Sequence, residues 1–160
     1  MSTQASNHPS PTANHSWTET ETDNAALVVE FIHLLMNEHD FDTVRSRFGS
    51  GTYTQHNHGI ADGLDGVIDT VGDLTKRFPD YSYEIKHVTA DGDVVVVHSH
   101  ATLKASHRGD DRKGFNIIDR WRVADGQLVE HWDAVQPIDL FGRLYTLFTG
   151  GRVRNDNGTY

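Results

Sequence analysis

The sequence contains no cysteine, little basic charge and no long apolar run. Without cysteine, the chain has no disulfides, no thiolate metal site and no cysteine nucleophile. No hydrophobic stretch approaches the roughly 20 residues of a membrane-spanning helix. The first basic residue is Arg45. Signal and transit peptides carry basic residues near their start, so we expect neither here. We therefore expect a cytoplasmic protein that does not enter a membrane.

Positive charge is scarce relative to negative charge. The 14 Lys and Arg residues oppose 23 Asp and Glu residues, which gives a formal net charge of −9. A protein of this charge repels phosphate backbones and anionic lipid surfaces, so we expect neither nucleic acid nor a membrane as its partner. The 160 residues, of which 36% are hydrophobic, suffice for one globular domain with a core.

Apolar spacing in the first half of the chain predicts helices. Residues 1–23 are rich in Ser, Thr, Asn and Pro, and we expect a disordered tail. Helical spacing then covers about residues 24–37, 39–48 and 64–78, and the third segment carries the strongest signal. A short strand over residues 52–57 is expected between the second and third helices.

The second half of the chain predicts strands. Alternating or apolar segments cover residues 81–89, 94–104, 115–123 and 126–136, and Asp-Gly pairs mark two hairpin turns. This order predicts an α+β domain over residues 24–136, in which three helices cover one face of a curved, mostly antiparallel sheet and leave a cavity. Residues 137–160 form an extension whose amphipathic part is expected to pack as a short helix on the domain or on a second subunit.

The last strand carries the most informative polar pair. In GQLVEHWDAVQ, His131 and Asp133 fall on one face, where an imidazole and a carboxylate can act on the same ligand. Asp119 lies on the apolar face of the preceding strand, between Ile117 and Trp121. A carboxylate on a buried face needs a partner or takes up a proton. The alternative is a surface His and Asp on a half-exposed strand.

Further polar side chains are expected to point into the same cavity. We predict catalytic roles for Asp133, His131, Asp119 and His98, and substrate contacts for Tyr53, His56, Asn57, His100 and Trp121. Several ionisable groups in one cavity indicate function. A slip of one residue in strand register inverts every such assignment, so the sequence leaves open which face of each hairpin is inward.

Histidine pairs offer a metal hypothesis. His56 and His58, and likewise His98 and His100, are spaced so that each pair could chelate zinc or non-haem iron from one strand face. A cupin-type barrel, however, would have a Glu soon after such a pair, and none follows His100. We therefore predict no metal and no cofactor, with a metal-dependent enzyme as an alternative.

Several segments resemble SnoaL-like proteins of the NTF2-like superfamily. They are YTQHN at 53–57, GDVVVVHSHA at 92–101, IIDRWRVADGQLVEHWDAVQP at 117–137 and the terminal NDNG. The resemblance implies a cone-shaped, cystatin-like α+β domain that forms a homodimer through the outer face of its sheet. In the polyketide cyclases of this superfamily, an Asp on a late strand is the acid and base of a cofactor-free, aldol-type ring closure. Asp133 occupies the matching place.

Together, the residues and the resemblance predict a small cofactor-independent lyase or isomerase for a small, hydrophobic, carbonyl-containing substrate. Asp133 would remove a proton alpha to the carbonyl, while His131 and either His98 or His100 would hold the enolate oxygen or return the proton. The alternatives are a domain that binds a small ligand without catalysis and a metal-dependent enzyme that uses its His-x-His pairs.

Overall fold

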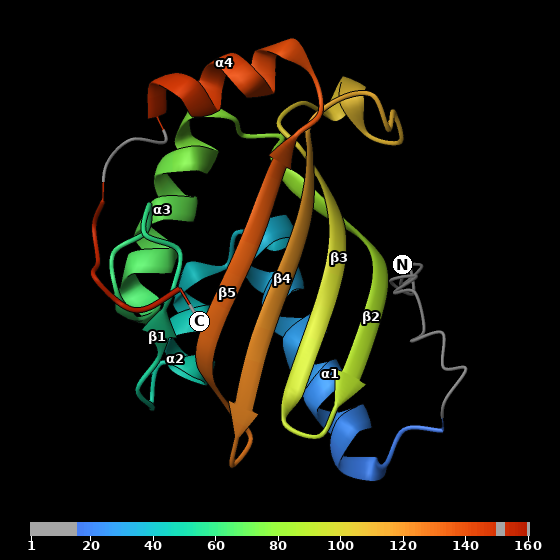
Figure 1. The fold of residues 1–160 in the computed structure, drawn as a ribbon, viewed down its shortest axis with the longest axis vertical. Coiled ribbons are helices and arrows are strands. Elements are labelled where there is room, and N and C mark those ends of the chain that lie inside the picture. Colours follow the sequence, from blue (N-terminus) through green and yellow to red (C-terminus); the bar gives the residue numbers. More distant parts are fainter. Residues whose placement is uncertain (1–15, 150–152, 160) are drawn as a thin grey trace, which may run out of the picture.

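The computed structural model describes residues 16–149 and 153–159, and it shows a curved sheet with helices against one face (Figure 1). Within these residues the strands follow the order β1-β5-β4-β3-β2. The strands are β1 (Thr54–Gln55), β2 (Ser82–Asp91), β3 (Val94–Thr102), β4 (Phe115–Ala124) and β5 (Gln127–Pro137). The helices are α1 (Glu19–Ile32), the π-helix η1 (His33–Glu38), α2 (Phe41–Phe48), α3 (Gly63–Arg77), the 3-10 turn η2 (Ala105–His107) and α4 (Leu140–Thr149). The predicted α+β architecture is confirmed.

Helix α1 begins earlier than the apolar spacing predicts. Thr18 and Glu21 form a capping box, in which the Thr18 hydroxyl accepts the Glu21 amide at 3.2 Å and the Glu21 carboxylate accepts the Thr18 amide at 2.8 Å. Trp17 packs against the core. Residues 18–23 therefore belong to the cap and first turn rather than to a tail, and residues 1–15 lie outside the described residues.

The sheet is antiparallel except at one edge, where β1 pairs in parallel with β5. Side chains alternate between an inner face, which the helices cover, and an outer face. The inner face of β4 carries Phe115, Ile117, Asp119, Trp121 and Val123, all of them buried. This is the face that the alternation in the sequence predicts. Asp119 is thus a carboxylate within a hydrophobic layer.

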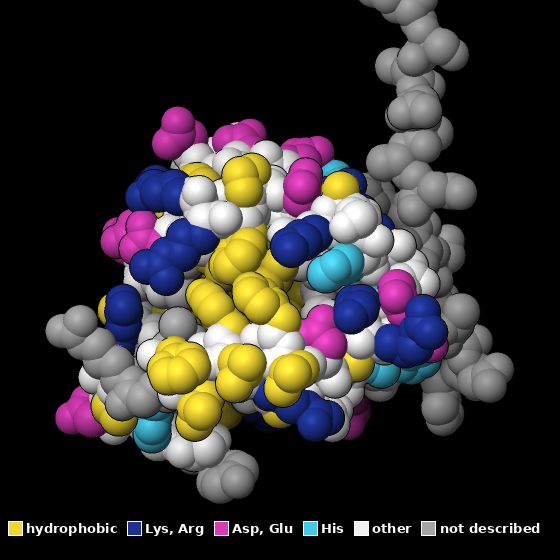
Figure 2. Space-filling model, turned by 90° about the horizontal axis from the view of Figure 1, so that it is seen from above, with side chains coloured by type: hydrophobic (Ala, Val, Ile, Leu, Met, Phe, Trp, Pro, Cys, Tyr) yellow, Lys and Arg dark blue, Asp and Glu magenta, His cyan; other side chains and the backbone are white. Residues whose placement is uncertain are grey.

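The C-terminal extension folds back on the domain through α4. Rings of α4 contact Phe78 at the end of α3: Phe141 at 6.3 Å and Tyr145 at 5.8 Å between centroids. The other side of α4 stays in contact with solvent, since Leu147 and Phe148 are 74% and 83% exposed. Figure 2, which looks onto the end of the molecule where α4 lies, shows hydrophobic side chains gathered there. Every helix in the described ranges is too short or too polar to cross a bilayer.

Two glycines of α3 give a matched test of how this helix is placed. A Cβ on Gly66 would lie 2.0 Å from the carbonyl oxygen of Ala61, whereas a Cβ on Gly72 would meet only the Phe41 ring at 3.8 Å. We expect Gly66→Ala to lower the free energy of unfolding by about 2 kcal/mol or more, because backbone atoms must shift. Gly72→Ala should raise it by about 0.5–1 kcal/mol through helix propensity. Urea unfolding measures both, and equal effects of the two substitutions would contradict this packing.

Candidate functional site

A cavity of about 270 Å³ lies between α3, α4 and the inner face of the sheet. Most of its lining is apolar or aromatic, with Tyr81, Tyr83 and Tyr145 among the rings. Its ionisable carboxylate and imidazole groups come from the sheet: Asp119, His131 and Asp133. A largely apolar cavity with a few converging polar groups is typical of a site for a small ligand.

Asp119 and His131 form a buried pair at the wall of this cavity. Nε2 of His131 lies 3.1 Å from Oδ1 of Asp119, and the residues are only 5% and 2% exposed, respectively. The second carboxylate oxygen of Asp119 is buried and lacks a hydrogen-bond partner in the described structure. Burial raises the pKa of Asp119; the hydrogen bond and the charge of His131 oppose this rise, and the negative charge of Asp133 adds to it.

Gln55 fixes the other side of the His131 ring. Its Oε1 accepts the amide of Asn57 at 2.8 Å, which leaves Nε2 to donate to Nδ1 of His131 at 3.1 Å. This network assigns the ring proton to Nε2, which donates to Asp119. When the ring is doubly protonated, Nδ1 can donate to Oε1 of Gln55, 3.2 Å away. Gln55 is fully buried and can therefore stabilise either protonation state of His131.

Aromatic rings hold the imidazole in plane. The Trp121 ring stacks on His131 with centroids 4.7 Å apart, and the Tyr53 ring lies 6.4 Å away. Both aromatic residues are buried, and burial raises the pKa of Tyr53 above its usual range. They were predicted to contact the substrate, but they lie behind His131 rather than among the side chains that line the cavity. Both rings pack against the imidazole.

Asp133 is the more accessible of the two carboxylates. It pairs across the strands with Asp119 and is half-buried. The side-chain amide of Asn57 donates to both of its oxygens at 2.7 Å. The backbone N–H of Gly59 sets the orientation of that amide, because it donates to the side-chain oxygen Oδ1 of Asn57 at 2.8 Å. Asn57 lines the cavity and fixes the orientation of the Asp133 carboxylate.

His98 and His100 are not in this cavity, and the prediction that they point inward is wrong. The register of β3 places Val97 beside Asp119, so His98 and His100 lie on the outer face. His98 contacts Asn116 at 2.5 Å, and His100 contacts the Lys113 carbonyl at 2.7 Å. Because both faces of this strand carry valines, the sequence alone does not distinguish them.

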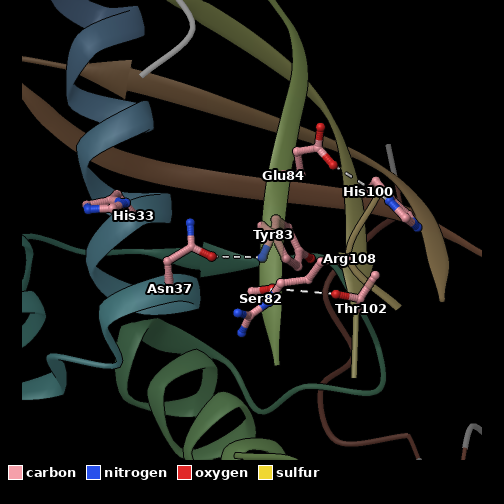
Figure 3. A pocket seen from close by; sticks show the side chains of 8 residues that line it. All are labelled: His33, Asn37, Ser82, Tyr83, Glu84, His100, Thr102 and Arg108. Carbon is pink, nitrogen blue, oxygen red and sulfur yellow. Dashed lines mark hydrogen bonds and ion pairs between the residues drawn. The ribbon is translucent and has the colours of Figure 1, made fainter. Parts of the chain in front are cut away.

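Figure 3 shows His100 in another groove, together with groups from η1, β2 and β3. Its ring lies across β3 from the inner cavity, beside Glu84, whose carboxylate is 4.0 Å away. Arg108 reaches the same groove and donates to the Ser82 hydroxyl at 3.2 Å. The groove and the inner cavity share Tyr83, but Asp119, His131 and Asp133 do not line the groove.

His56 also lies on the outer face, contrary to its predicted role in substrate binding. Its ring stacks on Trp132 with centroids 4.4 Å apart, and its Nε2 lies 3.3 Å from Glu130. Partial burial raises the pKa of Glu130, but hydrogen bonds from Arg122 and His56 outweigh it and hold that pKa below its usual value. The alternation along β1 explains the placement, since Gln55 and Asn57 take the inner positions on either side of His56.

Neither histidine pair belongs to a group of three potential metal ligands among the described residues. In the part of the chain that the structure describes, the one group of three potential ligands is Asp119, His131 and Asp133, whose ligand atoms lie within 4.8 Å of one another. Both ring nitrogens of His131 already contact Asp119 and Gln55. A metal ion would have to replace the hydrogen bond between His131 and Asp119, so the arrangement fits a hydrogen-bonded pair better than a preformed metal site.

The arrangement supports proton transfer by carboxylates rather than by the imidazole. Both ring nitrogens of His131 lie within hydrogen-bond distance of protein groups: Nε2 contacts Asp119 and Nδ1 contacts Gln55. Asp119 and Asp133 then face the cavity in different environments, one within the hydrophobic layer and the other held by an amide. Carboxylates whose environments differ in this way can divide the roles of acid and base.

Sequence reasoning missed the residues that hold these groups. Gln55 was not predicted, although it alternates with Tyr53 and Asn57 along one strand and so shares their inner face. Asn155 and Asn157 were seen only as part of a family-like terminal motif. Both donate hydrogen bonds to the loop that carries Asn57. The sequence gives no spacing signal for a contact so distant along the chain.

Comparisons with known proteins agree with this geometry. A family model described as the SnoaL-like domain matches residues 28–131. A candidate polyketide cyclase from Bacillus cereus ATCC 10987 is 19% identical, with a TM-score of 0.66 over 93% of this chain and 97% of the other. AclR, a candidate hydroxylase from Streptomyces galilaeus, is 20% identical, with a TM-score of 0.62 over 79% and 83%. An NTF2-like protein of unknown function from Cytophaga hutchinsonii ATCC 33406 is 16% identical, with a TM-score of 0.55 over 81% and 99%.

These structural similarities establish the fold alone, since the identities are low and the names differ in activity. The comparison with curated proteins gives no significant match. The role of each residue therefore has to be argued from the site itself.

The buried carboxylate predicts a pH-dependent stability. The folded chain raises the pKa of Asp119 and so holds its proton more tightly than the unfolded chain does. This contribution to stability is complete below the ordinary pKa of about 3.9 and is lost as the pH rises through the raised value. We expect Asp119→Asn to gain stability relative to the wild type as the pH rises from about 4 to 7.

Thermal unfolding of both proteins across this pH range measures the difference. Asp111→Asn is the matched control, because it makes the same change from carboxylate to amide at an exposed position. A difference in melting temperature between Asp119→Asn and the wild type that stays constant with pH would contradict the raised pKa of Asp119.

Proposed function

Because the chain belongs to the family of SnoaL-like domains within the NTF2-like superfamily, we propose that it is a small cofactor-independent lyase or isomerase. Its substrate is a small hydrophobic molecule with a carbonyl group, and the reaction begins with loss of a proton alpha to that carbonyl. The observation that supports this best is the pair of cross-strand carboxylates, Asp119 and Asp133, at the polar end of an otherwise apolar cavity.

Asp133 is the base in this proposal. In its ionised form the carboxylate removes the alpha proton, and the electron pair of the C–H bond moves toward the carbonyl oxygen. The amide of Asn57 holds both Asp133 oxygens and limits their motion. Orientation of this kind and a well-placed base together account for much of the acceleration of an activated C–H cleavage.

Asp119 is the acid. Its raised pKa favours the protonated form, which can donate a hydrogen bond from its unpartnered oxygen to the enolate oxygen. His131 positions Asp119 through their 3.1 Å contact, and this hydrogen bond favours the ionised form of the Asp119 carboxyl. The proton held by Asp133 then returns to another carbon in an isomerase, or a group beta to the carbonyl leaves in a lyase. This assignment gives Asp119 the enolate-binding role that the sequence had suggested for His131 together with His98 or His100.

The size of the cavity limits the substrate. A volume of about 270 Å³ lies at the small end of ligand pockets and accommodates on the order of ten non-hydrogen atoms. Monocyclic and bicyclic ketones fit this limit, whereas a tetracyclic polyketide does not. The three tyrosine rings in the lining favour a planar or aromatic substrate.

Exchange of alpha protons with deuterium provides the test. Wild-type protein in D₂O is mixed with small ketones such as 2-tetralone, and the loss of the alpha-proton signal is followed by ¹H NMR. We expect Asp133→Asn to reduce catalysed exchange by about 10² to 10⁴-fold, because it removes the base. Asp111→Asn should exchange at the wild-type rate, since Asp111 is exposed and remote from the cavity lining.

An Asp133→Asn variant with full activity would exclude Asp133 as the base. If wild-type protein binds the ketones without exchanging their protons, the alternative of a non-catalytic ligand-binding domain replaces the enzyme. Elemental analysis of protein purified without a His tag tests the remaining alternative, a metal bound by Asp119, His131 and Asp133.

We also propose that the outer face of the sheet forms a homodimer, as the family resemblance implies. This face carries the Trp132 ring between His56 and Arg120, whose guanidinium carbon lies 4.2 Å from the ring centroid, and Ile118 is 38% exposed. Sedimentation equilibrium should show a dimer for the wild type. Ile118→Arg should shift the equilibrium toward the monomer, because the dimer interface would have to bury the new charge. A wild type that remains monomeric at all concentrations would overturn this.

A further inference from the structure

The end of the chain lies along the loop that follows β1, beside the proposed active site. Figure 1 shows the C-terminal segment running next to this loop, and backbone contacts agree: the amide of Arg154 donates to the carbonyl of His58 at 2.8 Å. The imidazoles of His56 and His58 contact the carbonyls of Gly158 and Asn157, respectively. Residues 153–159 and residues 55–62 therefore form one connected layer.

Two asparagine side chains make the most specific contacts in this layer. Nδ2 of Asn155 donates to the carbonyls of Asn57 at 2.9 Å and of Ile60 at 2.7 Å. Asn155 is only 9% exposed, so the side chain that makes these hydrogen bonds is itself largely shielded from water. The side chain thereby closes the turn whose first residue, Asn57, holds Asp133.

Asn157, two residues further along the segment, makes contacts of the same kind. Its Nδ2 donates to the Gln55 carbonyl at 2.8 Å and to Asp62 Oδ1 at 2.8 Å. The same Asp62 oxygen accepts the Gln55 amide at 2.9 Å. The hydrogen bond from Gln55 is the main reason why the pKa of Asp62 lies below its usual value. Asn157 therefore ties both ends of the loop together.

We propose that Asn155 and Asn157 are positioning residues for the reaction, an inference that rests on the proposed function. Asn155 acts through Asn57 on Asp133, and Asn157 acts through Gln55 on His131. The backbone of the loop is attached to the sheet by the short β1 pairing, which joins Thr54 to Glu130 and Gln55 to His131, and by the amide of His56, which donates to the His131 carbonyl at 2.9 Å. Without the two amides, the loop carbonyls lose these hydrogen bonds, although the Asn57 carbonyl keeps the one from the Ile60 amide, and the base loses part of the support for its geometry.

The segment also contains its own control. Asp156 lies between the two asparagines but is exposed, so Asp156→Ala removes a side chain from the same segment without removing a loop contact. We compare Asn155→Ala, Asn157→Ala and Asp156→Ala in the full chain. The melting temperature of each should stay within a few degrees of the wild type, because the core is untouched.

The first readout is spectroscopic and needs no substrate. In ¹H–¹⁵N spectra, the side-chain amide of Asn57, which is bound to a carboxylate, should be well separated and protected from exchange with solvent. Asn155→Ala should shift this signal toward the position of a free amide, whereas Asp156→Ala should leave it in place. An Asn57 signal that is unchanged in both asparagine variants would overturn the positioning role, whatever the activity of the protein.

The second readout is the exchange assay. For both asparagine variants we expect kcat to fall about 10 to 100-fold with KM within about threefold, since a displaced base slows chemistry more than binding. An unchanged kcat, or a change in KM alone, would contradict the inference. If wild-type protein shows no exchange, the proposed function fails, and the spectroscopic readout alone decides whether the chain end positions Asn57.

Discussion

A carboxylate buried in a hydrophobic layer is the constraint around which this structure is arranged. Asp119 takes a position on β4 that an apolar residue would fill more favourably, and its one protein partner in the described structure is His131. Burial of a carboxylate without full hydrogen bonding costs stability, and the role that we propose for Asp119 in the reaction accounts for its presence here. The raised pKa is the direct consequence of that placement.

The rest of the site follows from holding this pair in place. His131 needs a fixed ring, which Gln55 and the stacked Trp121 provide. Asp133 needs an orientation that keeps it facing the cavity, which Asn57 provides. Both amides lie on one short segment at the parallel edge of the sheet. The function therefore depends on a loop that secondary structure alone holds weakly, and the end of the chain supplies further hydrogen bonds to it.

The sequence predicted the fold and the two carboxylates because these leave local signals. Helical spacing, Asp-Gly turns and alternation identify the elements, and an Asp among the apolar residues of a strand stands out. The inward direction of β3 could not be predicted, since both of its faces carry valines, and His98 and His100 were misplaced for that reason. Gln55 and the terminal asparagines were missed because their contacts join segments far apart in the sequence, where no periodicity applies.

The central claim is that the cavity stabilises an enolate rather than merely accommodating an apolar ligand. A planar enol analogue tests this, because a site that lowers the barrier to enolate formation binds the analogue more tightly than the ketone. Isothermal titration calorimetry of wild-type protein with 2-naphthol and with 2-tetralone gives the two dissociation constants. The account predicts that 2-naphthol binds at least about 100-fold more tightly, and equal affinities for the two compounds would contradict it.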